Sequence, residues 1–467
     1  MRNNIIIFFA ALAGVYYMIH IAGTAQTSIM AAIVIFFVTL GISFIRGVDA
    51  LYIIVFAMLF SPEIGVASST GKAGGEGAGS VVLRLEDVLL MAVGCGWLLR
   101  TAYDKRKFGI VRTGVNTGIG IYIAVSVVAT MLGVIGGSVN MQSGIFNNLK
   151  YFEYFFLFFM ILAHVRSKKI ITRMLVAMMI VFFLAMIYGY TQIELTGNKR
   201  VTAPFDPTEP NTFGGYMVLL MCVIFGIALT DQRARIRVPL ILLLLFAIPP
   251  FIFTLSRASY MAIITGWLAF LVFSRHRITI GAIIIAMVAV SLIGVPMLPT
   301  KVQKRITGTF QPEKEVHVKI GSVDLDASAS ARIISYEMAV TTWLKSPLLG
   351  FGVTGTHFID SQYFRLLAET GIIGLCAFLF MMWSLLRETW KVHEQCTDNF
   401  LKGAALGFFC GIIAILAHAV SANSFIIIRI SEPFWLLAGL ILLIPIVKDE
   451  EGTTESADIQ PVPQTLP

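Results

Sequence analysis

The chain has 467 residues, of which 57% are hydrophobic and only 13% are charged. Soluble domains carry about 25% charged residues, so this composition excludes a soluble globular protein and indicates a polytopic membrane protein. The formal net charge of +8 does not require a nucleic-acid partner, because lysine and arginine collect in the cytoplasmic loops of membrane proteins.

Hydrophobic stretches follow one another along most of the chain, and one helical span needs about 20 apolar residues. We therefore predict an all-α polytopic membrane protein with about 12–14 transmembrane helices. The first stretch is interpreted as an uncleaved helix; the alternative is a signal peptide cut near Ala25. The stretches are centred near Ala11, Phe36, Phe56, Ala92, Ala124, Leu157, Val181, Leu220, Leu245, Ile264, Ile285, Phe378, Ile412 and Leu437.

The basic residues predict which loops are cytoplasmic. With the N-terminus inside, almost every short inside loop carries lysine or arginine, as the positive-inside rule requires. Both termini are then cytoplasmic, and the long polar interval over residues 298–368 is extracytoplasmic. This interval separates N-terminal helices over 1–297 from C-terminal helices over 369–447, and the polar tail over 448–467 is predicted to be disordered.

The large outside loop has its own predicted elements. Apolar residues alternate over 315–326 around Gly321 and Ser322, which predicts a β-hairpin with a two-residue turn. A helix is expected from about Ala329 to Lys345, since Pro347 follows. Asp324 and Asp326 form a D-x-D pattern, but the central Gly and terminal Glu of a calcium loop are missing, so no metal site is predicted.

Arg257 stands at the outer entrance of a very apolar segment. An arginine in a membrane is costly and usually marks a partner or a pathway. The alternative is that its side chain extends to the lipid headgroups.

The pattern that closes the large loop is distinctive. Arg332 to Gly352 is followed by Asp360-Ser361 and, nine residues later, by Gly371-Ile372-Ile373-Gly374. Together with Arg200, the run Pro210-Asn211-Thr212-Phe213, and Ser256-Arg257, this pattern resembles the O-antigen ligase and polymerase family. The likeness extends over roughly residues 82–445 and includes the position of the large loop.

This resemblance implies a bacterial inner-membrane glycosyltransferase of GT-C-like architecture whose active site faces the periplasm. Its donor would be a glycan on a polyprenyl diphosphate, and its acceptor another glycan or lipid. Other polysaccharide-assembly proteins, such as a flippase or a chain-length regulator, would be its partners. No cofactor or metal is expected, because no nucleotide-sugar has to be held outside the cell. A direct displacement at the anomeric carbon would invert its configuration.

The leaving lipid diphosphate needs lasting positive charge, which arginine supplies because its planar fork binds phosphate oxygens in pairs. We expect this role for Arg200 and Arg257, and next for Arg332 and Arg365. The acceptor hydroxyl needs a base, for which the candidates are Asp360, His357 and Glu369.

Two of the candidate bases have structural alternatives. Asp360, like Ser361, could simply cap the following helix, and Glu369 could pair with Arg365 at the i, i+4 spacing. Gly371 and Gly374 are expected to allow close helix packing.

One departure from the family pattern bears on the reaction. Ligases of the family usually carry His where this chain has Asp360, and His357 lies three residues earlier. The sequence therefore favours a polymerase of repeat units over a ligase that transfers the glycan to lipid A core. A transporter or lipid flippase is the alternative from another class. It is disfavoured because no internal repeat is evident and the polar groups gather at one membrane face.

Overall fold

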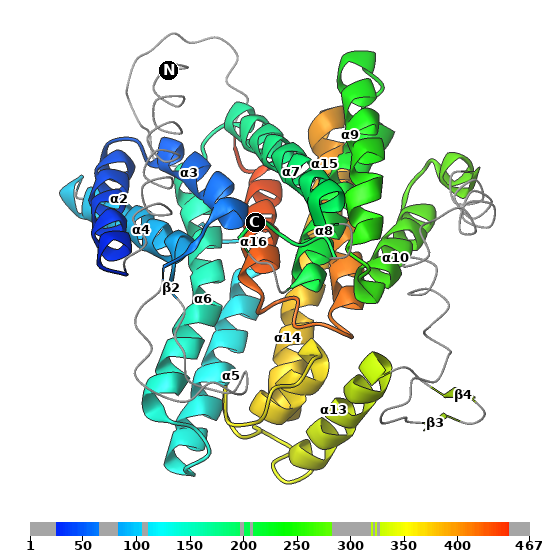
Figure 1. The fold of residues 1–467 in the computed structure, drawn as a ribbon. Coiled ribbons are helices and arrows are strands. Elements are labelled where there is room, and N and C mark those ends of the chain that lie inside the picture. Colours follow the sequence, from blue (N-terminus) through cyan, green and yellow to red (C-terminus); the bar gives the residue numbers. More distant parts are fainter. Residues whose placement is uncertain are drawn as a thin grey trace.

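In a computed structural model of the chain, residues 25–64, 83–104, 111–196, 200–205, 209–282, 319–320, 323–324 and 327–447 are described. Over these residues the fold is a bundle of helices (Figure 1), which confirms the predicted fold class. The helices are α2 (Ala25–Ile45), α3 (Gly47–Phe60), α4 (Leu85–Tyr103), α5 (Asn116–Ile135), α6 (Met141–His164), α7 (Lys168–Thr196), α8 (Pro210–Thr230), α9 (Ala234–Phe253), α10 (Arg257–Phe273), α13 (Ala327–Trp343), α14 (Gln362–Gln395), α15 (Asn399–His418) and α16 (Ile428–Leu443).

Seven of the described helices are long and apolar enough to cross a membrane, so the protein is a multi-pass membrane protein. They are α5, α6, α7, α8, α9, α14 and α15. The apolar stretches centred near Ala11 and Ile285 lie outside the described residues. Each of the other predicted stretches corresponds to one helix.

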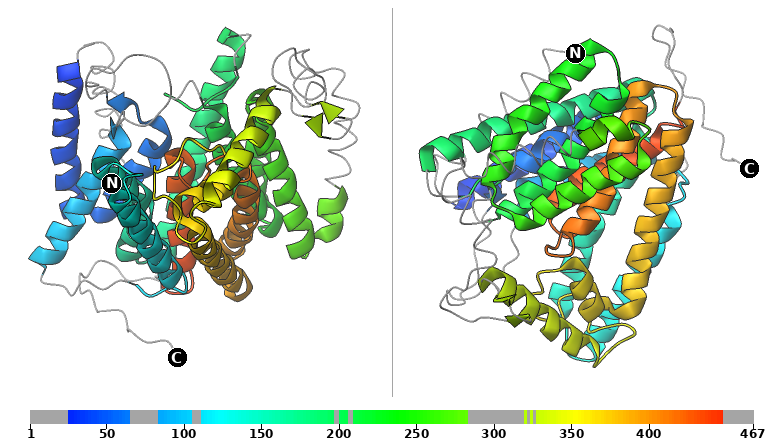
Figure 2. Two further views of the ribbon diagram at one scale, coloured as in Figure 1. Left: turned by 90° about the horizontal axis from the view of Figure 1, so that it is seen from below. Right: turned by 90° about the vertical axis from the view of Figure 1, so that its right-hand side faces the viewer.

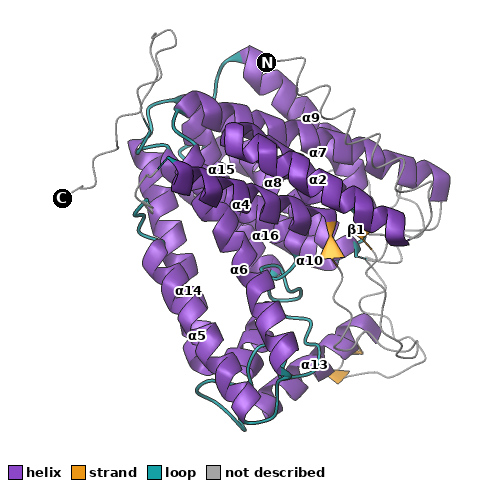
Figure 3. Cartoon of the chain, turned by 90° about the vertical axis from the view of Figure 1, so that its left-hand side faces the viewer, coloured by secondary structure: helices purple, strands orange, loops and turns teal. Residues whose placement is uncertain are grey.

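Two pairs of two-residue strands are the described β-structure (Figure 3). In the first pair, β1 (Glu63–Ile64) runs antiparallel to β2 (Leu83–Arg84). In the second, β3 (Lys319–Ile320) runs antiparallel to β4 (Val323–Asp324), and Ile320 faces Val323. This register leaves two residues for the turn, so the predicted hairpin in the large loop is confirmed. Asp326 lies outside the described residues.

The centre of the bundle is formed by α8, α15 and α16 (Figure 2). The apolar window of α8 is 94% buried, whereas that of α9 is only 22% buried and leaves its apolar side chains for lipid. Glycines bring α8 and α15 together: a Cβ on Gly226 would lie 2.5 Å from the carbonyl oxygen of Gly403. Small residues permit such close backbone contact, which is how helices associate in a bilayer where apolar surfaces gain little from leaving lipid.

The helix α13 packs against α14 at one end of the bundle (Figures 1 and 2). It begins two residues before the predicted start at Ala329 and ends before Pro347. The helix α14 has 34 residues and is interrupted at Gly371, whose φ of 66° and ψ of −168° are not helical. It begins at Gln362, within the interval assigned to the large loop from the sequence.

The segment 347–352 crosses the interruption of α14 and hydrogen-bonds with it. Ile372 N donates to Pro347 O at 2.9 Å, and Gly352 N donates to Glu369 O at 2.8 Å. A Cβ on Gly371 would lie 2.3 Å from the carbonyl carbon of Leu348. The close packing expected of Gly371 is therefore present, but it is against the backbone of a loop rather than against another helix. This joint fixes the first two turns of α14.

Replacing Gly371 with alanine should therefore loosen the joint. The new side chain meets the Leu348 backbone and must hold a positive φ, a strain of about 1–3 kcal/mol. We expect a lower melting temperature for Gly371→Ala in detergent. The matched control is Gly120→Ala in α5, where an added Cβ meets nothing within 4 Å, and there the melting temperature should stay or rise. Equal stability of both variants would contradict the proposed joint.

Candidate functional site

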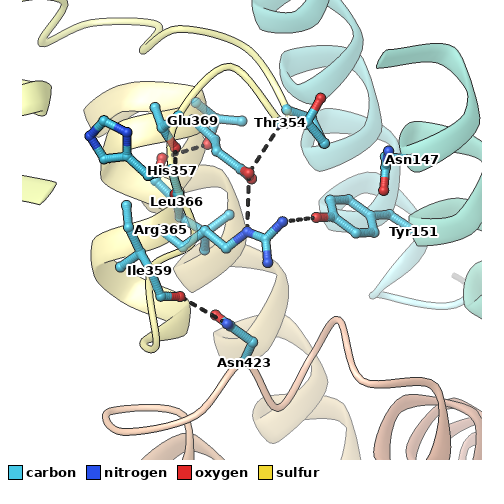
Figure 4. Close-up of polar contacts among 12 residues, drawn as sticks. Asn147, Tyr151, Thr354, His357, Ile359, Arg365, Leu366, Glu369 and Asn423 are labelled. Carbon is cyan, nitrogen blue, oxygen red and sulfur yellow. Dashed lines mark hydrogen bonds and ion pairs between the residues drawn. The ribbon is translucent and has the colours of Figure 1, made fainter. Parts of the chain in front are cut away.

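A salt bridge holds Arg365 at the start of α14 (Figure 4). Its Nε lies 3.0 Å from Glu369 Oε1, and its Nη2 donates to the hydroxyl of Tyr151 on α6 at 2.8 Å. The side chains of Arg365 and Glu369 are only 15% and 3% exposed. The same Glu369 oxygen accepts the backbone N–H of Thr354 at 3.1 Å. The i, i+4 pairing raised as the alternative for Glu369 is therefore present, and it joins α14 to α6 and to the loop before α14.

Asp360 lies beside Arg332 of α13, with Arg332 Nε 3.4 Å from Asp360 Oδ2. The side chain of Asp360 is 37% exposed and that of Arg332 20% exposed, so a substrate can reach both. The residue that caps α14 is Ser361, and its side chain makes no capping hydrogen bond. The capping alternative is thus absent for Ser361, and the contact made by the Asp360 carboxylate is with an arginine.

The backbone around Asp360 is anchored to the loop between α15 and α16. Asn423 Nδ2 donates to Ile359 O at 2.8 Å (Figure 4), and Gln362 N donates to Ala419 O at 3.1 Å. On the other side, Tyr336 of α13 stacks on Phe364 with ring centroids 4.5 Å apart. These contacts fix the position of the Asp360 carboxylate relative to the bundle.

Tyr336 also ties α13 to the loop after α15. Its hydroxyl donates to Val420 O at 2.9 Å. Burial raises the pKa of Tyr336, so the hydroxyl keeps the proton that it donates. This hydrogen bond fixes α13 against the loop after α15, and with it the backbone of Arg332, which lies one turn earlier on the same helix.

His357 is exposed on the loop just before Asp360. In the close-up it lies on the same side as Glu369 (Figure 4). Exposure leaves its imidazole accessible to solvent and substrate, while its main-chain carbonyl accepts from Thr356 Oγ1 at 3.4 Å.

The two arginines predicted from the earlier motifs come together at the start of α10. Arg200 donates from Nε to Thr254 O and from Nη2 to Leu255 O, both at 3.0 Å. These carbonyls belong to the residues immediately before Ser256-Arg257. Leu255 has a positive φ of 51°, a conformation that costs energy for a residue with a side chain. Arg200 thus holds the strained turn from which Arg257 enters its helix.

A hydrogen-bonded chain behind Arg257 includes a histidine that the sequence analysis missed. Ser256 Oγ donates to Asn211 Oδ1 at 2.8 Å and contacts Ser259 Oγ at 2.8 Å. Ser259 Oγ lies 3.2 Å from His418 Nε2, and His418 Nδ1 lies 2.7 Å from Ser424 Oγ. His418 therefore links the Arg257 end of α10 to the loop after α15, whose Asn423 donates to the carbonyl of Ile359 next to Asp360.

A second group of charged residues borders the site on α4, α6 and α16. Lys150 lies 3.0 Å from Asp87, and Arg429 donates to the carbonyls of Pro204 and Ser61. Glu86 and Glu432 are 2% and 0% exposed. Among the described residues neither carboxylate has a hydrogen-bond partner. Lys150 is the neighbour of Tyr151, so α6 carries contacts of both groups.

Within the described residues, no cluster of three or more His, Cys, Asp or Glu side chains is placed to hold a metal ion. The polar atoms described above are instead arginine donors, hydroxyls, a histidine and single carboxylates. Arrangements of this kind bind anions and exchange protons.

The structural role of Glu369 can be tested by replacing it with glutamine. The buried Arg365 would lose its charged partner, and hydrogen bonds to charged groups contribute about 2 kcal/mol. We expect a clear fall in melting temperature for Glu369→Gln in detergent. Glu337, which is exposed on α13, supplies the control, because Glu337→Gln should change stability little. A Glu369→Gln protein of wild-type stability that has lost activity would point instead to Glu369 as the base.

Part of the chain that contains this site matches a known protein family. Residues 241–379 match the Wzy_C family model, described as O-antigen ligase. The matched segment contains Arg257, Arg332, Asp360 and the interrupted start of α14, so the resemblance drawn from the sequence is confirmed. No curated protein matches the chain. The protein is thus a multi-pass membrane protein whose residues 241–379 are similar to the O-antigen ligase family.

Proposed function

We propose that the protein transfers a glycan from a polyprenyl diphosphate to a glycan acceptor, and so polymerises repeat units of a surface polysaccharide. The observation that carries this proposal is the position of a partly exposed carboxylate, Asp360, 3.4 Å from Arg332. The turn that carries Arg200 and Arg257 is connected to this position by hydrogen bonds through Ser259, His418 and the loop after α15. An acceptor base and cations for a leaving diphosphate thus belong to one connected region.

In the proposed reaction, the donor diphosphate binds to Arg257 and Arg332, with Arg200 holding the turn before Arg257. The acceptor hydroxyl gives its proton to Asp360 and attacks the anomeric carbon. The bond from this carbon to the diphosphate oxygen breaks, and the developing charge on that oxygen is stabilised by the arginines. Direct displacement inverts the anomeric configuration, and neither a metal nor a cofactor takes part.

Arg365 is assigned a different task. Its guanidinium already contacts Glu369 and Tyr151, so it stabilises the start of α14 and supports diphosphate binding only indirectly. Glu369 is likewise a positioning residue. The base is therefore Asp360, with His357 as the alternative, since its exposed imidazole is three residues away.

A ligase is the second candidate, because the matched family model is described as O-antigen ligase. In that case, the same base and arginines would act on a lipid A core or another acceptor. The departure at Asp360, where ligases usually carry His, is what favours the polymerase.

A reconstituted assay separates these functions. Purified protein in lipid vesicles is given polyprenyl-diphosphate oligosaccharide, and the products are separated on a gel. A ladder that grows by repeat units is expected. Transfer that begins only when lipid A core is added would replace the polymerase with the ligase. Movement of intact donor across the bilayer with no new glycosidic bond would contradict both, and retained anomeric configuration would contradict direct displacement.

The base is tested in the same assay with Asp360→Asn. Loss of a general base lowers the rate by about 10²–10⁴-fold, and kcat should fall while the melting temperature is unchanged. His357→Gln is the matched variant and should keep kcat within a few fold. The reverse result, an active Asp360→Asn and an inactive His357→Gln, would transfer the role of base to His357.

A further inference from the structure

Five side chains form one hydrogen-bonded chain from the start of α8, past the start of α10, to the loop after α15. In order they are Asn211, Ser256, Ser259, His418 and Ser424, and successive polar atoms are 2.8, 2.8, 3.2 and 2.7 Å apart. All except Asn211 have an exposed fraction of 0%. Bulk water therefore does not reach these contacts, and the side chains must supply the protons for their own hydrogen bonds.

The number of protons fixes the direction of each hydrogen bond in this chain. The side-chain oxygen of Asn211 only accepts, so the single hydroxyl proton of Ser256 is donated to it. The hydroxyl of Ser259 must then donate to Ser256. With its own proton used in this way, Ser259 must accept a proton from His418 Nε2. His418 therefore carries a proton on Nε2.

The other ring nitrogen of His418 is an acceptor. An imidazolium ion in these buried surroundings would need a counter-charge, since an unpaired buried charge is very costly. None of the ion pairs among the described residues includes His418. The ring is therefore neutral, and its Nδ1 accepts from the hydroxyl of Ser424.

Two consecutive glycines of α8 leave room for this chain. A Cβ on Gly214 would lie 2.8 Å from Ser259 Cβ, and a Cβ on Gly215 would lie 3.1 Å from His418 Cε1. Residues without a side chain permit such close helix contact. The positions of Ser259 and His418 are thus set from the α8 side as well as by their hydrogen bonds.

Ser424, the last member of the chain, lies between two residues that fix the backbone around Asp360. Asn423 donates to the carbonyl of the residue before Asp360 (Figure 4). The N–H of Phe425 donates to Gln362 Oε1 at 3.2 Å, two residues after Asp360. The chain therefore ends on the segment that positions the proposed base.

We propose that His418, as the neutral tautomer protonated on Nε2, is a positioning residue that aligns the turn before Arg257 with the backbone of Asp360. This role rests on the proposed function, in which Arg257 binds the donor diphosphate and Asp360 activates the acceptor. Transfer requires reacting atoms held about 3–3.5 Å apart, and these two groups come from separate segments. The Nε2 side of the ring holds the segment of the cation, and the Nδ1 side holds the segment of the base.

The tautomer is measured by nitrogen NMR of the full chain in detergent, with histidine isotope-labelled at both ring nitrogens. Protonated and unprotonated ring nitrogens give well-separated signals, and the signals lost in His418→Gln belong to His418. We expect a protonated Nε2 and an unprotonated Nδ1 at neutral pH. A proton on Nδ1 would overturn the proposal, because the direction of the hydrogen bonds would then differ.

Two variants separate the two sides of the ring. The amide nitrogen of glutamine can take the place of Nε2, whereas the amide of asparagine reaches only the place of Nδ1. His418→Asn loses the contact with Ser259, so its Kd for a short-chain polyprenyl diphosphate should rise about fivefold, the effect of one neutral hydrogen bond. His418→Gln keeps that contact but loses the one with Ser424. Its Kd should stay unchanged, and its kcat in the reconstituted assay should fall about fivefold.

The matched control is His393→Gln, because His393 lies in the last turn of α14, whereas Asp360 precedes the first. Its Kd and kcat should equal those of the wild type. Wild-type values in both His418 variants, or an equal loss of both quantities in both variants, would reduce His418 to a packing residue and overturn the proposal. Failure of the proposed function has a different signature: the wild type itself then neither binds the diphosphate nor forms product.

Discussion

A guanidinium group at the end of an apolar helical bundle must be given hydrogen-bond acceptors and a counter-charge, because an unpaired charge in such surroundings is very costly. Arg365 meets this requirement through Glu369 and Tyr151. Glu369 lies one turn after Arg365 on α14, and the interruption at Gly371 lets the loop over 347–352 hydrogen-bond to the same turn. The positions of Thr354, His357 and Asp360, and hence of the proposed base, depend on this arrangement.

Strain in the backbone is concentrated at the same end of the protein. Among the described residues, the non-glycine residues with positive φ are Phe205, Leu255 and Thr354. Phe205 lies five residues after Arg200, Leu255 lies two residues before Arg257, and the backbone N–H of Thr354 donates to Glu369. Such conformations persist where surrounding contacts enforce them, and they are frequent at functional sites. The hydrogen bonds of Arg200 to Thr254 and Leu255 are contacts of this kind. Arg200 thus holds the turn from which Arg257 enters α10.

Sequence patterns predicted the elements that depend on local order. Apolar stretches located the helices, alternation around Gly321-Ser322 located the hairpin, and Pro347 located the end of α13. The i, i+4 spacing of Arg365 and Glu369 identified their pairing. Contacts between distant segments had no such pattern: in the sequence, His418 is the last residue of an apolar helix, and nothing near it indicates a contact with Ser259. The same holds for Lys150 with Asp87, and for Arg429, whose partners are main-chain carbonyls of two other loops. The interruption of α14 was also hidden, because the sequence around Gly371 is compatible with a continuous helix.

The central claim is that Arg257 binds the diphosphate of the donor through paired hydrogen bonds. The most direct measurement is the affinity of the purified protein for a short-chain polyprenyl diphosphate, determined calorimetrically for the wild type and for Arg257→Lys. Lysine keeps the charge but loses the planar fork, and one charge-assisted hydrogen bond corresponds to about a tenfold change in affinity. The account predicts that Arg257→Lys binds about tenfold more weakly at unchanged melting temperature. Wild-type affinity in Arg257→Lys would contradict it.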